Sequence, residues 1–231
     1  DAIHRASSAS SAYGPISCKI FGSKHVHIAI KCWFLRSLVL TRLLFNIHTW
    51  VMRPTELSKL NGPYTRAVRR IAGCVRCSSS DSETGERNAT DFQVRTMIGA
   101  ASIDSLAIQA RLMYAARLAA NDKASSLKAL LASKPGGKAM PWAVQLRNDL
   151  QLMYDKSDIR KLVRSLDHDD GGLTWLFAMK HEHAEFKHCV TQTSFLESCL
   201  DSRCSQHEGD GHAFVCNQCD PTVSFSTEKA L

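Results

Sequence analysis

Residues 38–73 constrain the fold more than any other part of the chain, because they join an apolar, arginine-containing segment to a basic amphipathic one. The apolar run covers residues 33–47 and contains Arg36 and Arg42. A membrane span needs about 20 mainly apolar residues, and a central arginine costs at least ~2.5 kcal/mol there. The run is too short and too charged for a span, so we expect a buried helix.

The longest helix that the sequence predicts covers residues 25–51. Two other helices are expected to stop at turn signals, because proline rarely continues a helix. Gly14-Pro15 should close a helix over residues 2–13, and Asn61-Gly62-Pro63 should divide the segment that starts at Pro54. The apolar side predicted for residues 25–51 consists of Trp33, Leu40, Leu44, Ile47 and Val51.

Residues 64–72 form the clearest amphipathic helix of the chain, followed by Gly73 as a natural C-cap. Tyr64, Val68 and Ile71 make its apolar stripe, and three arginines are expected to lie on the opposite side. Guanidinium groups one turn apart can bind phosphates together, although such a face is more often simply solvated. The candidate nucleic-acid-binding residues are Lys59, Arg66, Arg69, Arg70 and Arg76.

Helical periodicity continues after a polar, serine-rich stretch, and no set of strands that could form a large sheet is evident. We therefore predict a mainly α protein, an irregular helical bundle with a small Cys/His-rich tail. The predicted divisions are a basic helical segment at 1–77, a polar linker at 78–90, a helical region at 91–200 and the tail at 201–231. Within 91–200 the expected helices are 91–98, 102–120, 124–132, 142–154, 158–166 and 173–190.

Charge is distributed unevenly between the two ends of the chain. Residues 1–80 hold twelve Lys and Arg against two Asp and Glu, whereas residues 201–231 hold two against five. A basic front half suggests a polyanionic partner. We expect non-specific binding of RNA or DNA, no membrane partner, and an intracellular location, nuclear or cytoplasmic, since no signal peptide is recognisable. The oligomeric state is not indicated.

The nine cysteines are expected to be reduced thiols or metal ligands, because an odd number without a secretory signal does not suggest a disulfide framework. Cys216 and Cys219 have the spacing of half a zinc site. The chain ends at Leu231 before any histidine pair follows, so the tail would be an incomplete ββα zinc finger. Alternatively, Cys204 and His207 could complete a four-ligand site with Cys216 and Cys219.

Several stretches, in this order, resemble the thumb and connection region of non-LTR retrotransposon reverse transcriptases. They are SAYGPISCKIFGSK (11–24), RSLVLTRLLFNIHTW (36–50), LSKLNGPYTRAVRRIAG (57–73) and the arginine-containing segment 98–121, and residues 216–231 resemble the start of the family's C-terminal zinc finger. The resemblance implies a fragment of an RNA-directed DNA polymerase whose helices contact nucleic acid.

The resemblance also implies that the chemistry lies elsewhere. Polymerisation needs carboxylates that hold two Mg²⁺ ions, usually at a Tyr-x-Asp-Asp strand end. Asp169-Asp170 stands in HDDGG, which is typical of a turn and not of a strand. We therefore predict that this chain is inactive alone and that Mg²⁺ belongs to a region outside it. The alternative hypothesis is a helical zinc-binding protein–protein interaction module of unrelated origin.

Overall fold

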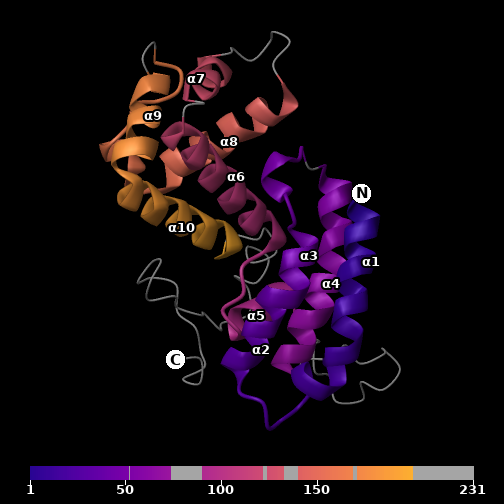
Figure 1. Ribbon diagram of the computed structural model, residues 1–231. Helices are drawn as coiled ribbons and strands as arrows, with labels where there is room; N and C mark the ends of the chain where they lie inside the picture. Colours follow the sequence, from indigo (N-terminus) through magenta and orange to yellow (C-terminus); the bar gives the residue numbers. More distant parts are fainter. Residues whose placement is uncertain (52, 74–89, 122–123, 133–139, 169–170, 200–231) are drawn as a thin grey trace. The chain divides into compact units, whose positions relative to one another are not determined.

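The computed structural model describes residues 1–51, 53–73, 90–121, 124–132, 140–168 and 171–199 (Figure 1). Every regular element in these residues is helical, which confirms the predicted mainly α class. No helix in this part of the chain reaches the length and hydropathy needed to span a bilayer.

The described helices divide into two compact units, one built from Asp1–Phe45 and Arg53–Ile103 and the other from Asn46–Met52 and Asp104–Glu197. The division differs from the predicted one, since residues 91–103 lie in the same unit as the basic N-terminal helices. The elements of the first unit are α1 (Ala2–Ile16), the π-helix η1 (Ser17–Phe21), α2 (Ile28–Phe34), the π-helix η2 (Leu35–Leu40), α3 (Thr41–Leu43), α4 (Pro54–Ala72) and α5 (Asp91–Met97). The second unit contains the 3-10 helix η3 (Ile47–Thr49), α6 (Ile103–Ala120, whose first residue is assigned to the first unit), α7 (Ala124–Ala132), α8 (Pro141–Lys156), the 3-10 helix η4 (Asp158–Lys161), α9 (Gly171–His181) and α10 (His183–Cys199, whose last two residues are assigned to the first unit).

Helix α4 is the central element of the first unit, with α1 and α5 packed against it. It begins at Pro54, as predicted, and the Glu56 side chain accepts a hydrogen bond from the Arg53 backbone N–H at 3.0 Å. Gly73 ends it with φ 76°, which confirms the predicted C-cap.

The break predicted at Asn61-Gly62-Pro63 is wrong, because α4 continues through these residues. Proline inside a helix removes one backbone hydrogen bond and crowds the preceding turn. The helix is nevertheless favoured on both sides of this point, because it buries large apolar side chains there. Full burial of one such side chain stabilises the fold by about 1.5–3 kcal/mol. That buried face consists of Leu60, Tyr64, Ala67, Val68 and Ile71.

Similarly, α1 does not end at Gly14-Pro15, and the chain passes from Ile16 directly into the π-helical turn η1. Proline's fixed φ fits a helix even where its missing N–H costs a bond. The wider i→i+5 turns of a π-helix often mark functional sites. The η1 turn forms part of the candidate site described below.

The long helix predicted for residues 25–51 is interrupted, because Asn46 adopts a left-handed φ of 55° and η2 is π-helical. The predicted apolar face is wrong for the same reason: Trp33 is 61% and Val51 41% exposed. Of the five residues predicted, only Ile47 is fully buried. The stripe that packs inward is Leu35, Val39 and Leu43, spaced by four residues each.

The second unit has its own apolar core, centred on Trp175 and Phe186. The Trp175 indole N–H donates to the Arg164 carbonyl at 2.9 Å, so the buried ring keeps its polar atom satisfied. A buried ion pair joins α6 to α8, with Arg111 Nε 2.5 Å from Asp149 Oδ2. Burial raises the pKa of Asp149, and Arg111 acts against that rise.

The helices predicted for the second unit are mostly present, with three changes. Residues 158–166 contain only the short 3-10 helix η4, and the helix predicted at 173–190 is divided into α9 and α10 at Glu182. The segment Asn46–Met52 also belongs to this unit. His48 accepts a hydrogen bond from Trp142 Nε1 at its carbonyl (2.7 Å), and its ring lies 4.3 Å from that of Tyr114.

Candidate nucleic-acid interface

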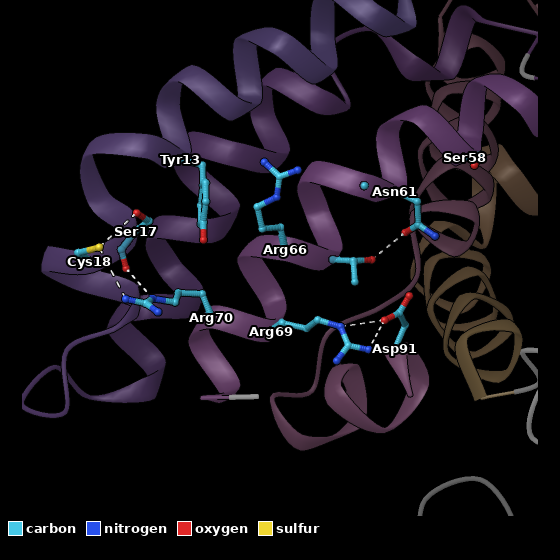
Figure 2. A pocket seen from close by; sticks show the side chains of 11 residues that line it. Tyr13, Ser17, Cys18, Ser58, Asn61, Arg66, Arg69, Arg70 and Asp91 are labelled. Atoms are coloured by element: carbon cyan, nitrogen blue, oxygen red, sulfur yellow. Dashed lines mark hydrogen bonds and ion pairs between the residues drawn. The ribbon is translucent and has the colours of Figure 1, made fainter. Parts of the chain in front are cut away.

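An open groove of about 690 Å³ lies in the first unit, between the end of α1, the η1 turn, one face of α4 and the start of α5 (Figure 2). The three arginines predicted from the sequence line it together with Tyr13, Asn61 and Asp91. The structure therefore brings Arg66, Arg69 and Arg70 to one place, but it gives each of them a different environment. We name this feature the α1–α4 groove.

Arg69 is buried, with 8% of its surface exposed, and it is neutralised by Asp91. Its Nε donates to Asp91 Oδ1 at 2.9 Å, and its Nη2 contacts the same oxygen. The sequence predicts Arg66, Arg69 and Arg70 together opposite the apolar stripe, and the structure distinguishes Arg69 from the other two by its burial. Helical periodicity could not show this, because the covering carboxylate arrives on α5, which is 22 residues away in sequence.

Arg70 is half-buried, and its guanidinium lies against the backbone of Gly22. A Cβ at Gly22 would be only 2.7 Å from Arg70 Nε, so glycine is what leaves room for the guanidinium. The other contacts are long: Arg70 Nε is 3.5 Å from the Ser17 carbonyl, and Nη2 is 3.6 Å from Cys18 Sγ. Arg70 thus lies against η1, and no carboxylate of the described residues is paired with it.

Arg66 is exposed, and its side chain extends beside the ring of Tyr13 (Figure 2). Among the described residues it forms no ion pair. Burial raises the pKa of the Tyr13 hydroxyl, and Arg70 and Arg66 lower it. The hydroxyl therefore lies within the field of both guanidinium groups, and the Tyr13 ring also contacts Phe21 with 5.9 Å between centroids.

The charge balance of the groove follows from these contacts. Asp91 is its one acidic lining residue within the described chain, and Arg69 already occupies that carboxylate. Within the part of the chain that the structure describes, no carboxylate is paired with Arg66 or Arg70. They add to a basic background, since residues 1–73 hold eleven Lys and Arg against Asp1 and Glu56. Such a groove attracts anions.

The other predicted site residues are not part of this groove. Lys59 is exposed on α4 and does not line it. Arg76 and the predicted zinc ligands Cys204, His207, Cys216 and Cys219 lie outside the described residues, as do Asp169 and Asp170. In the part of the chain that the structure describes, no group of three or more His, Cys, Asp or Glu side chains could hold a metal ion. The incomplete zinc site, and the zinc-binding module that depends on it, remain predictions.

Sequence reasoning did not identify Tyr13, Gly22 or Asp91 as site residues. Tyr13 and Gly22 stand in the stretch 11–24 that resembles the retrotransposon family, but their spacing alone indicates no chemistry. Asp91 could be anticipated only as a first-turn acid of a helix.

Comparison with known proteins neither adds to this assignment nor opposes it. No family model matches the chain, and no curated protein or solved structure is significantly similar to it. The α1–α4 groove and the sequence resemblance are therefore the two features of the chain that bear on its function.

Proposed function

We propose that this chain is a fragment of a non-LTR retrotransposon reverse transcriptase and that its first unit binds the phosphate backbone of RNA or DNA in the α1–α4 groove. The observation that carries the proposal is the pair of guanidinium groups, Arg66 and Arg70, for which the described residues provide no carboxylate partner. They stand four residues apart on α4, just over one helical turn and about 6 Å along the axis. Arginine forks at this spacing suit the phosphates of a nucleic-acid strand.

The electrostatics of the first unit support the same proposal. Phosphate binding depends on the number of cations that reach the backbone and is largely independent of base sequence. Arg69 supports the site indirectly, because its ion pair with Asp91 fixes α5 against α4 and removes the acidic group that would repel a phosphate. The proposal therefore assigns phosphate contacts to Arg66 and Arg70 and a structural role to Arg69.

In this proposal the chain binds nucleic acid without extending it. The resemblance covers the thumb and connection side of the family's polymerase, and the Mg²⁺-binding carboxylates belong to a different region. We expect no template-directed extension by the purified 231-residue chain. Detection of such extension would contradict this part of the proposal.

The binding test uses fluorescence anisotropy with a labelled oligonucleotide over a series of salt concentrations. On duplex DNA, each phosphate contact contributes about 0.9 to the slope of log K against log salt. The double variant Arg66→Glu/Arg70→Glu should therefore bind much more weakly and lose roughly 1.8 from the magnitude of that slope. Arg69 is left intact, because its replacement would leave Asp91 without its partner.

A matched control changes the same total charge elsewhere. Lys180 and Lys187 are exposed on α9 and α10 of the second unit, so Lys180→Glu/Lys187→Glu alters the net charge equally. If nucleic acid binds in the groove, this control should retain most of the parent's affinity for the oligonucleotide. Its slope of log K against log salt should equal that of the parent. Equal weakening by both double variants would show that net charge alone, and not the groove, attracts the nucleic acid.

A further inference from the structure

The α1–α4 groove has an aromatic wall as well as basic groups. Tyr13 projects from α1 into the space beside Arg66 (Figure 2). Its ring has a tilted contact with that of Phe21, with 5.9 Å between the ring centroids and an angle of 35° between the planes. Because the Tyr13 side chain is half-buried and lines the groove, the accessible part of the ring can receive a second flat group.

The groove has room for one nucleotide. It is open to solvent, and its volume is about 690 Å³. The flat faces of the bases in a duplex are covered, because each base is stacked on its neighbours. An intact duplex could offer its phosphates to Arg66 and Arg70, but it could not place a base against Tyr13.

We infer that the α1–α4 groove accepts a single-stranded nucleic acid, with one base stacked on the Tyr13 ring while neighbouring phosphates bind Arg66 and Arg70. This inference rests on the proposed function and adds the form of nucleic acid that the site selects. Proteins that bind single strands combine a basic groove with aromatic side chains on which bases stack. Because every base has a flat face, the expected preference is for single strands over duplexes and not for a particular sequence.

Polar groups on the α4 side of the groove suit this role. Asn61 and Thr65 line it and lie 3.5 Å apart at Asn61 Oδ1 and Thr65 Oγ1. That contact is at the limit of a hydrogen bond, so both side chains can exchange it for the edge of a bound base. Gly62 adds no side chain between them and the solvent.

The test compares a labelled 12-nucleotide deoxythymidine strand with a labelled 12-base-pair duplex, using the full chain. Tyr13→Leu keeps an apolar contact for Phe21 but removes the aromatic face, and Tyr13→Phe keeps the face but removes the hydroxyl. Because the stacking of one base on an aromatic ring contributes to the binding free energy, Tyr13→Leu should weaken single-strand binding by about tenfold. Tyr13→Phe should bind single strands nearly as well as the parent, and duplex binding should change little in either variant.

Trp33→Leu serves as the control, because Trp33 is an exposed aromatic residue of the same unit that does not line the groove. Circular dichroism establishes that each variant is folded. The inference is overturned if the parent binds both nucleic acids equally and Tyr13→Leu binds the single strand like the parent. If Arg66→Glu/Arg70→Glu still loses binding in that case, the proposed function stands and only the stacking role fails. Absence of binding to either nucleic acid by the parent at low salt would overturn both.

Discussion

Replacing Gly22 by alanine is the most direct perturbation of the arginine arrangement that leaves every charge in place. The added Cβ would lie 2.7 Å from Arg70 Nε, 2.8 Å from Nη2 and 3.0 Å from Cζ. Non-bonded heavy atoms normally approach to about 3.5 Å. The guanidinium must therefore move by ~0.8 Å, which it can do because it is the end of a flexible side chain.

The stability of the protein should change little. Gly22 has φ −83°, which alanine adopts without strain. Loss of glycine's freedom in the unfolded chain contributes roughly 0.4–1 kcal/mol of stability, and loss of the two long contacts of Arg70 offsets part of it. We expect the free energy of unfolding to stay within about 1 kcal/mol of the parent value.

Nucleic-acid binding should weaken nonetheless, because Arg70 would no longer be held where a phosphate meets it. Ordering a long side chain on binding costs about 0.5–1.5 kcal/mol, which corresponds to a roughly 2- to 12-fold loss of affinity. The salt slope should stay near the parental value, since the charge can still reach a phosphate. This outcome distinguishes Gly22→Ala from Arg70→Glu, which should also lower the slope.

The assay combines anisotropy titrations with thermal denaturation. Gly172→Ala is the matched control, because Gly172 lies on α9 of the second unit and a Cβ there would be 3.7 Å from Leu131 Cβ, an ordinary van der Waals contact. In an Arg70→Ala background, Gly22→Ala should have no further effect on affinity. The reasoning is refuted if Gly22→Ala binds as tightly as the parent, or if its effect persists without the Arg70 guanidinium.

Two further predictions concern the first unit itself. Gly62→Ala should leave the free energy of unfolding in urea within about 1 kcal/mol of the parent value, because the gain in helix propensity of about 1 kcal/mol is opposed by the clash of a helical Cβ with the following Pro63; a loss of about 3 kcal/mol or more would contradict this balance. Burial raises the pKa of Tyr64 to about 12, and its hydroxyl donates to the Ala101 carbonyl at 2.5 Å. The neutral phenol therefore stabilises the fold below pH 10, and roughly 2–3 kcal/mol should be lost as the pH rises from 10 through 12. Tyr64→Phe should lack this loss, and identical pH dependence in parent and variant would contradict the assignment.

The sequence was a good guide to where helices form and a poorer guide to where they end. Periodicity placed α7 at its observed bounds and predicted the apolar stripe Tyr64, Val68 and Ile71. It failed at Pro63, because burial on both sides of a proline can outweigh the lost hydrogen bond. Turn propensity is local, whereas the burial that overrides it depends on partners from elsewhere in the chain.

The candidate site shows the same limit. The charge pattern identified three neighbouring arginines, and the structure distinguishes them through contacts that the pattern does not contain. Arg69 is paired by a carboxylate on α5, and Arg70 is held beside a glycine of η1. Neither partner lies at a helical spacing from its arginine. The positions of charges could be predicted from sequence, but which of them remain available to a ligand could not.

The placement of Asn46–Met52 has a consequence for dissecting the molecule. The chain enters the second unit at Asn46, returns to the first at Arg53 and enters the second again at Asp104. Expressing residues 104–197 as an isolated piece would strip Trp142 of its carbonyl acceptor and Tyr114 of its stacking ring, both supplied by His48. An isolated second unit would therefore have to include residues 46–52, either joined covalently to residues 104–197 or added as a separate peptide.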